Sequence, residues 1–154
     1  FGLMLTKQGP KVVEYNCRFG DPETQVVLPL LNADLMTIFR HVHDGTLDQV
    51  DITWKDACAA CVMEASGGYP EAYKKGYEIS GLNENGQHAG VTVFHSGTKK
   101  ENGKFYTNGG RVLGIEATAP TLKEALDTCY GAIKEITFED MHYRTDIGRK
   151  VLEK

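Results

Sequence analysis

Residues 12–23 restrict the fold of this chain most, because the stretch opens as a strand and closes as the start of a helix. Side chains alternate across a strand, so residues two apart share a face. One face of the strand predicted over residues 11–19 is apolar or aromatic, and we expect it to pack into a core. Its residues are Val13, Tyr15, Cys17 and Phe19. The other face carries Glu14, Asn16 and Arg18, which fit the wall of a binding site better than a core.

The polar face has suitable chemistry for a divalent cation and an anion. The carboxylate of Glu14 and the amide oxygen of Asn16 are hard ligands of the kind that Mg²⁺ prefers. The guanidinium of Arg18 suits a carboxylate or a phosphate. Gly20 then lets the chain turn, and Asp21 can cap the following helix. A strand face that simply meets water shows the same alternation, so spacing alone leaves both interpretations open.

The neighbouring residues predict a hairpin and a broken helix. Residues 1–6 have a strand pattern, and a Gly-Pro turn returns the chain antiparallel along residues 11–19. A two-stranded hairpin is marginal alone, so we expect the other strands of this sheet to lie in a longer protein. Residues 22–43 have helical spacing interrupted at Pro29, and Gly45 ends the run. The apolar stripe of the later part predicts core packing. It consists of Leu35, Ile38, Phe39 and Val42.

The second half of the chain changes to short strands separated by tight turns. Strands are predicted over residues 57–65, 77–79, 91–95, 104–107 and 111–118, with a possible short strand at 50–52. A capping box from Thr121 to Glu124 opens a helix with one apolar stripe. The stripe consists of Leu122, Ala125, Leu126, Cys129 and Ile133. The predicted fold class is therefore α+β, with a small antiparallel sheet and a helix packed on one face.

Composition limits the partners of the chain. Its 154 residues suffice for one ordinary domain, or for one small domain and part of another. Hydrophobic residues at 41% and charged residues at 25% are typical of a soluble globular protein. The formal net charge of -4 argues against a general nucleic-acid or anionic-membrane binder. No apolar run has membrane-spanning length and no signal-peptide pattern is present, so we expect a cytoplasmic protein.

Cys58 and Cys61 are spaced as half of a zinc site or as a redox pair. No second pair with suitable spacing is present, and a structural zinc ion needs four ligands. An offset of three in a strand also puts the two sulfur atoms on opposite faces. We therefore expect buried apolar thiols here rather than metal or redox chemistry.

Glycine-bearing turns at residues 67–68, Gly97 and residues 109–110 are candidates for ligand contact. None matches the phosphate-binding fingerprint, which needs a strand before it and a long helix after it. A tight turn between strands accounts for Gly97. It is also the favoured interpretation of residues 67–68, where ligand contact is the alternative. Gly109 and Gly110 allow close backbone approach, and Arg111 follows them at the start of a strand. These three residues are candidate substrate-binding groups, although an arginine at a loop edge is often only a solvated charge.

Residues 14–25 read Glu-Tyr-Asn-Cys-Arg-Phe-Gly-Asp-Pro-Glu-Thr-Gln. This string closely resembles the signature of the phosphoribosylamine–glycine ligase family, whose members are ATP-grasp enzymes of purine biosynthesis. Four more strings follow in the family's order: Gly-Gly-Tyr-Pro at 67–70, His-Ser-Gly-Thr at 95–98, Asn-Gly-Gly-Arg-Val-Leu at 108–113 and Tyr-Arg-Thr-Asp-Ile-Gly at 143–148. Ser96 stands where one family pattern commonly has Ala. Five strings in order cover nearly the whole chain, which makes the resemblance specific.

The resemblance implies a ligase in which ATP phosphorylates the carboxylate of glycine and the amine of phosphoribosylamine attacks the acyl phosphate. Glu14 and Asn16 match the family's Mg²⁺ or Mn²⁺ ligands, which bridge the ATP phosphates. Arg18 matches the residue placed to stabilise the acyl phosphate or the glycine carboxylate. Asp21 would hold the glycine ammonium group or cap the helix, and one carboxylate cannot easily do both. Arg111 is expected to reach the phosphate of phosphoribosylamine.

The resemblance also implies that much of the enzyme lies outside this sequence. Residues 1–48 correspond to the carboxyl-terminal part of an ATP-grasp domain and residues 49–154 to the carboxyl-terminal domain. The groups that hold adenine and triphosphate are missing, so we expect the chain to depend on upstream domains and to be inactive alone. Another ATP-grasp ligase is one alternative, but those enzymes lack the Phe-Gly-Asp-Pro-Glu that follows Arg18. A non-catalytic module of the same fold is the other, and the absence of an upstream grasp domain would favour it.

Overall fold

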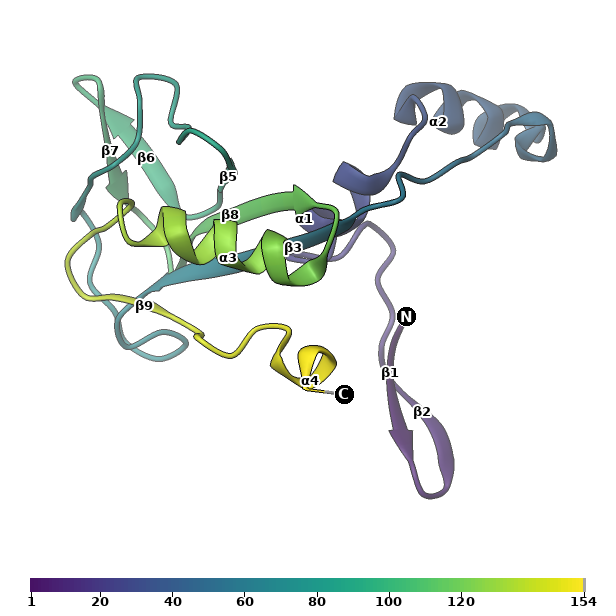
Figure 1. Ribbon diagram of the computed structural model, residues 1–154, viewed down its shortest axis with the longest axis horizontal. Helices are drawn as coiled ribbons and strands as arrows, with labels where there is room; N and C mark the ends of the chain where they lie inside the picture. Colours follow the sequence, from purple (N-terminus) through teal and green to yellow (C-terminus); the bar gives the residue numbers. More distant parts are fainter. Residues whose placement is uncertain (154) are drawn as a thin grey trace.

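The amino-terminal part of the chain is a lone hairpin followed by short helices, as shown by the computed structural model, which describes residues 1–153 (Figure 1). β1 (Gly2–Thr6) pairs antiparallel with β2 (Gly9–Glu14), which confirms the predicted hairpin. Four helical segments follow: α1 (Thr24–Val27), η1 (Leu28–Leu30), α2 (Leu35–Asp44) and η2 (Leu47–Gln49). The break predicted at Pro29 is thus a 3-10 turn. Gly45 ends α2 with a φ of 68°, a conformation that glycine adopts without strain.

Several expectations for this part are wrong. β2 ends at Glu14, so Asn16 and Arg18 follow the strand instead of lying on it. Residues 50–52 form no strand. The connector is tied to the end of η1 by an isolated bridge between Trp54 and Leu31 and by hydrogen bonds from Lys55 to the carbonyls of Pro29 and Leu30. The apolar face expected in a core is exposed, with Tyr15 at 67%, and α2 has no buried residue. Figure 1 shows the reason: the hairpin and α2 project away from the two sheets, and the element that α2 contacts most is the neighbouring η2.

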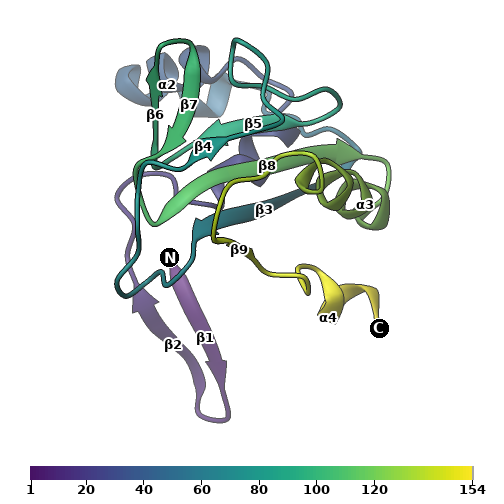
Figure 2. The same ribbon diagram turned by 90° about the vertical axis from the view of Figure 1, so that its left-hand side faces the viewer.

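The carboxyl-terminal part is built on a four-stranded antiparallel sheet in the order β5-β8-β3-β9. Its strands are β3 (Cys58–Ser66), β5 (Thr92–His95), β8 (Arg111–Ala119) and β9 (Met141–Tyr143). A second sheet has the order β4-β7-β6, with β4 (Glu78–Ile79), β6 (Thr98–Glu101) and β7 (Lys104–Thr107). α3 (Leu122–Ile133) lies along β3 and β8, and the short α4 (Arg149–Leu152) follows β9 (Figure 2). This arrangement confirms the α+β class.

The core of this part lies between α3 and the sheet. The predicted capping box is present: the Thr121 side chain accepts a hydrogen bond from the N–H of Glu124, whose carboxylate accepts from the N–H of Thr121. The apolar stripe of α3 is buried as expected at Ala125, Leu126, Cys129 and Ile133. β8 is buried on both faces from residue 112 to residue 117, because α3 covers one face and α1 contacts the sheet as well. The segment just before α1 is therefore held near β3 and β8.

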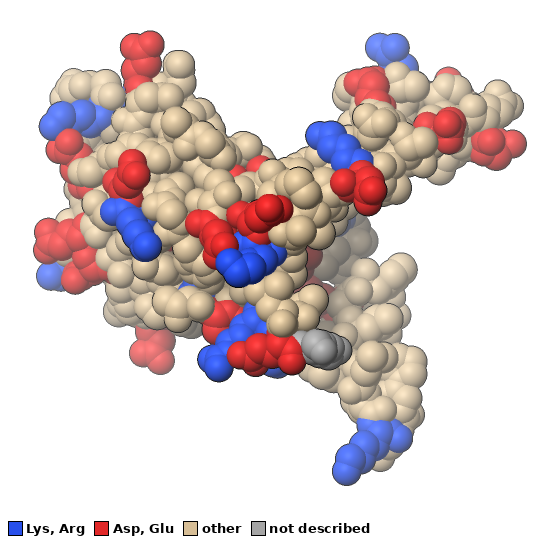
Figure 3. Space-filling view, in the orientation of Figure 1, with Lys and Arg blue, Asp and Glu red and all other residues tan. Residues whose placement is uncertain are grey.

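Helix length and the distribution of charge describe the surface of the molecule. Within residues 1–153, no helix has the length and apolar character needed to cross a bilayer. On the face shown in Figure 3, Lys and Arg side chains are interspersed with Asp and Glu and form no continuous basic patch.

The carboxyl group of Glu64 is buried in the core. Glu64 on β3 has no exposed surface, and neither oxygen of its carboxylate has a hydrogen-bond partner among the described residues. Its cross-strand neighbours are Leu113 on β8 and Tyr143 on β9. Burial raises the pKa of Glu64 to about 8, because the charged form would lose its hydration without a compensating partner. The carboxyl group is therefore largely protonated near neutral pH.

We expect the chain to lose stability as pH rises from about 4.5 to about 8. The folded pKa of Glu64 is raised above its ordinary value of 4.5, so the folded state holds the proton more tightly. The stabilisation is complete below the unfolded pKa and is lost as pH rises through the folded one. The loss reaches up to about 5 kcal/mol across this range. Urea unfolding at several pH values measures it.

Glu64→Gln should flatten this pH dependence, because the amide does not titrate. Glu101→Gln, at an exposed carboxylate on β6, is the matched control and should keep the wild-type dependence. An unchanged slope in Glu64→Gln would show that the buried carboxyl group does not cause it.

Candidate functional site

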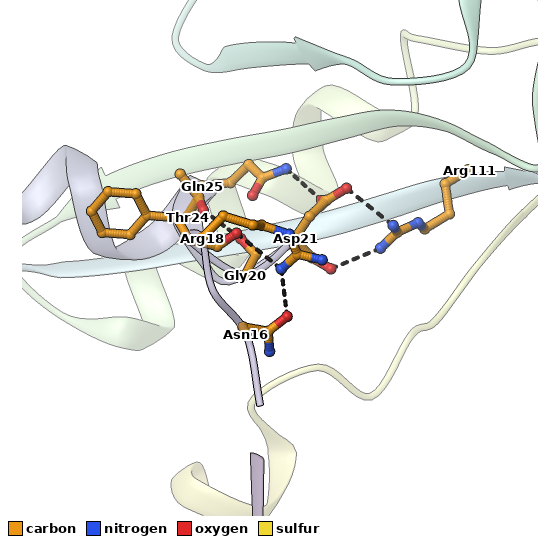
Figure 4. Close-up of polar contacts among 8 residues, drawn as sticks. Asn16, Arg18, Gly20, Asp21, Thr24, Gln25 and Arg111 are labelled. Carbon is orange, nitrogen blue, oxygen red and sulfur yellow. Dashed lines mark hydrogen bonds and ion pairs between the residues drawn. The ribbon is translucent and has the colours of Figure 1, made fainter. Parts of the chain in front are cut away.

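The predicted polar residues form a continuous hydrogen-bonded chain between β2 and α1. Asn16 Nδ2 donates to Glu14 Oε1 at 3.2 Å. Arg18 Nη1 donates to Asn16 Oδ1 at 2.6 Å and to the carbonyl of Phe19 at 3.0 Å (Figure 4). The structure thus brings these groups together although they do not share a strand face.

Glu14, Asn16 and Arg18 also line one cavity of about 270 Å³. The remaining lining residues are Phe1, Gly2, Phe19, Gly20 and Glu23. The carboxylate of Glu23 lies over Gly20, where a Cβ would be 2.5 Å from Glu23 Oε2. Gly20 is fixed in turn by Thr24, whose N–H donates to the Gly20 carbonyl at 2.9 Å and whose hydroxyl donates to the same oxygen. The turn after the polar residues is therefore tightly closed.

The donor set of Glu14 and Asn16 fits a hard divalent cation. The described residues contain no cluster of three or more His, Cys, Asp and Glu side chains, so a cation here would take few protein ligands, as Mg²⁺ does when phosphates supply the rest. Asn16 now turns its amide nitrogen to Glu14 and its oxygen to Arg18. Half a turn of the amide, whose oxygen and nitrogen are nearly equal in shape, would place Oδ1 beside the Glu14 carboxylate.

Asp21 is held from two sides. Arg111 Nη2 donates to Asp21 Oδ2 and Arg111 Nη1 to the Asp21 carbonyl, both at 3.0 Å, while Gln25 Nε2 donates to Asp21 Oδ1 at 2.8 Å (Figure 4). The N-cap position of α1 is Glu23, so the helix-capping role expected for Asp21 is wrong. Contact with a glycine ammonium group stays a prediction. Both carboxylate oxygens of Asp21 already accept hydrogen bonds within the chain.

A β-bulge aims Arg111 at Asp21. Along β3, Glu64 pairs with Leu113 and Ala65 pairs with Arg111, so Val112 is the extra residue of β8. With regular pairing, Arg111 would lie opposite Ser66 and point to the other face of the sheet. Bulges commonly re-aim a side chain in this way. Nothing in the sequence indicates this bulge.

Gly109 and Gly110 approach other loops of the same chain. A Cβ on Gly109 would lie 2.8 Å from the Cα of Gly97, and one on Gly110 would lie 2.0 Å from Cδ2 of Tyr69. These contacts within the chain are enough to explain why both positions need glycine. Substrate contact at either glycine stays a prediction. Sequence reasoning missed Tyr69 and Gln25, whose importance depends on contacts between distant segments.

Two of the cysteines, Cys61 and Cys129, are poor nucleophiles. Burial raises the pKa of Cys61 to about 12 and that of Cys129 to about 11. Cys58 and Cys61 are half-buried on β3, so their burial is less complete than expected. Thiols with raised pKa values remain protonated and are unreactive at neutral pH.

We expect the Arg111–Asp21 pair to contribute little to stability. Its side chains are 37% and 42% exposed, so water screens the attraction, and the coupling should stay below about 1 kcal/mol. A double-mutant cycle with Arg111→Ala and Asp21→Ala, followed by urea unfolding, measures it. The exposed Lys104–Glu78 pair is the comparison. A coupling well above that of the comparison pair would mean that Arg111–Asp21 stabilises the fold itself.

Comparison with family models matches residues 59–150 to "Phosphoribosylglycinamide synthetase, C domain" and residues 1–24 to the ATP-grasp (A) domain of the same enzyme. The boundary expected between residues 48 and 49 falls in the gap between these matches and stays a prediction. A crystal structure of phosphoribosylamine–glycine ligase from Thermotoga maritima superposes with a TM-score of 0.72 at 34% identity. It covers 94% of this chain and 35% of that one.

Two curated relatives agree with these matches. A phosphoribosylamine–glycine ligase of Caldanaerobacter subterraneus subsp. tengcongensis is 50% identical over 147 residues, which are 96% of this chain and 34% of the relative. The trifunctional purine biosynthetic protein adenosine-3 of Bos taurus is 49% identical over 152 residues, which are 98% of this chain and 15% of the relative. The chain thus spans about a third of the length of the single-function relatives. Because the C-domain match covers more than half of its residues, the chain belongs to the phosphoribosylglycinamide synthetase family.

Proposed function

We propose that the chain is part of an ATP-dependent ligase that joins glycine to phosphoribosylamine through an acyl phosphate in purine biosynthesis. The observation that carries the proposal is the convergence of Glu14, Asn16 and Arg18 on one cavity in a chain of this family. The family match favours this ligase over other ATP-grasp ligases. The same proposal includes a cytoplasmic location and a dependence on upstream ATP-binding domains. It also includes small-molecule substrates, with no nucleic-acid or membrane partner.

The polar chain supports the phosphoryl-transfer half of this reaction. Glu14 and Asn16 would hold the divalent cation, Mg²⁺ or Mn²⁺, which when bound neutralises charge on the ATP phosphates. Arg18 would face the glycine carboxylate and then the acyl phosphate, because a guanidinium matches both groups with paired hydrogen bonds. Holding the reacting groups in place is most of the catalysis in such a transfer.

Arg111 and the glycines before it would serve the second substrate. A guanidinium has five N–H donors, and two of its nitrogen atoms already donate to Asp21. The remaining donors of Arg111 are enough to reach the phosphate of phosphoribosylamine while the contact with Asp21 is kept. Gly109 and Gly110 would line the approach to that phosphate. Asp21 would contact the glycine ammonium group, and it would then have to share its carboxylate with Gln25 or Arg111.

Glu14→Gln in the complete polypeptide should separate function from stability. Replacing a charged ligand by an amide should lower turnover roughly tenfold to a hundredfold and raise the Mg²⁺ concentration needed for half-maximal rate. The melting temperature should stay close to wild type, because Glu14 is exposed and ends a hairpin with no buried side chain. Glycine-dependent release of ADP and thermal melts measure the two effects.

Glu78→Gln is the matched control, since Glu78 is an exposed carboxylate on β4 that pairs with Lys104 far along the chain from the site. It should leave both turnover and the Mg²⁺ requirement unchanged. Normal kinetics in Glu14→Gln would remove this residue from the cation site. A complete wild-type polypeptide without glycine-dependent ADP release would favour the non-catalytic module instead.

A further inference from the structure

The turn that presents Arg111 is enclosed by backbone contacts from two other loops. The N–H of Ser66 donates to the carbonyl of Gly110 and its hydroxyl donates to that of Gly109, both at 2.8 Å. On the other side, a Cβ on Gly97 would lie 2.5 Å from the Cα of Gly109. The N–H of Gly97 also donates to the carbonyl of Arg111 at 2.9 Å. The peptide that leads into Arg111 is therefore fixed from both sides.

The ring of Tyr69 completes this enclosure. A Cβ on Gly110 would lie 2.0 Å from Cδ2 and 2.5 Å from Cε2 of Tyr69, so the ring rests directly on the Cα of Gly110. Tyr69 is held by its N–H, which donates to the carbonyl of Ser66 at 3.1 Å, and by an edge contact with the ring of Tyr73. The residue is 41% exposed and lies outside the hydrophobic core. Its contact with Gly110 is thus not a by-product of core packing.

We propose that Tyr69 is a positioning residue for Arg111 and, through Arg111, for the segment that carries Arg18. The bulge at Val112 determines the face of the sheet from which the Arg111 side chain projects. The Tyr69 ring fills the space into which the peptide at Gly110 would otherwise rotate. Arg111 then leaves β8 in the direction in which its guanidinium meets both the carbonyl and the carboxylate of Asp21. Only the kinetic consequence rests on the proposed function.

The geometry explains why a ring is needed at this position. Arg111 has a long side chain with several rotatable bonds, so its reach to Asp21 depends on a fixed starting direction of the backbone. The pair with Asp21 is partly exposed and cannot itself force that direction. A misplacement of about 1 Å at a positioning contact can cost roughly a hundredfold in rate. The Tyr69 ring is the rigid body that prevents such a shift.

A double-mutant cycle in the complete polypeptide tests the proposal. Tyr69→Ala should speed hydrogen exchange in the peptide covering residues 15–24 and lower kcat/KM for phosphoribosylamine roughly tenfold. In an Arg111→Ala background, Tyr69→Ala should change neither quantity further, because the residue through which it acts is already gone. Tyr69→Phe should behave as wild type, since the ring makes the contact. Gly110→Ala should reproduce Tyr69→Ala by displacing the ring.

Tyr106→Ala, at a half-buried tyrosine on β7, is the matched control and should leave exchange in residues 15–24 unchanged. Tyr69→Leu replaces Tyr69→Ala in the cycle if the alanine variant fails to fold. The proposal would be overturned if Tyr69→Ala had the same effects in the wild-type and Arg111→Ala backgrounds. It would also be overturned if Tyr69→Ala left hydrogen exchange in residues 15–24 unchanged. Exchange is measured without substrate, so an inactive wild type would reject the proposed function while the exchange data still decide the role of Tyr69.

Discussion

The contact between Arg111 and Asp21 joins two parts of the chain that otherwise have little in common. Asp21 lies in the turn before α1, and Arg111 opens the central strand β8 of the carboxyl-terminal sheet. The pair is more than a third exposed on both sides, so its importance is geometric rather than energetic. Together with the contacts of α1 on β3 and β8, it places the segment with Glu14, Asn16 and Arg18 beside the sheet. The candidate site is thus positioned by an exposed ion pair on the well-packed carboxyl-terminal sheet.

The hydrophobic core that stabilises the molecule lies in its carboxyl-terminal half. Within residues 1–153, the buried apolar residues fall between Ala60 and Phe138, where α3 packs on β3 and β8. The hairpin and α2 instead depend on local hydrogen bonds, such as the one from the N–H of Thr37 to the side chain of Asp34 at the start of α2. The two halves therefore differ in how they are stabilised. The single-function relatives are about three times as long as this chain. An apolar face such as that of α2 is covered only where another element packs on it.

Signals that act within a few residues were predictable from the sequence. The capping box at Thr121 and the end of α2 at Gly45 both form as expected. In the turn between β6 and β7, Asn102 and Gly103 have φ values of 50° and 81°, which suit a tight hairpin. Their chemistry is local, so the sequence determines it. Periodicity also predicted which side of each element is apolar, but it could not say whether another element covers that side, as Tyr15 shows.

Features that depend on register or on distant contacts were not predictable. The alternation along β3 places Glu64 on a face, yet nothing in the sequence marks that face as a closed apolar space. The bulge at Val112 exists only in relation to β3, so the aim of Arg111 could not be read from its position in the chain. The sequence marked Gly110 for close approach by a ligand, which stays a prediction. The group that approaches it within the chain is Tyr69, about forty residues away, and no local pattern indicates that contact.

The hydrogen bonds of Asn16 connect the two chemical roles proposed for the site. The amide oxygen of Asn16 accepts from Arg18 while its amide nitrogen faces Glu14, so in this orientation Oδ1 is turned away from Glu14. If the Asn16 amide turned Oδ1 toward Glu14 to help hold a cation, Arg18 would lose its shortest hydrogen bond and keep the one to the carbonyl of Phe19. Binding of the cation and release of Arg18 toward an anionic group would then favour one another, since each removes a competitor of the other. Under the proposed function, Arg18 would become available when the cation that accompanies ATP is in place. This coupling would follow from rotation of the Asn16 amide group alone.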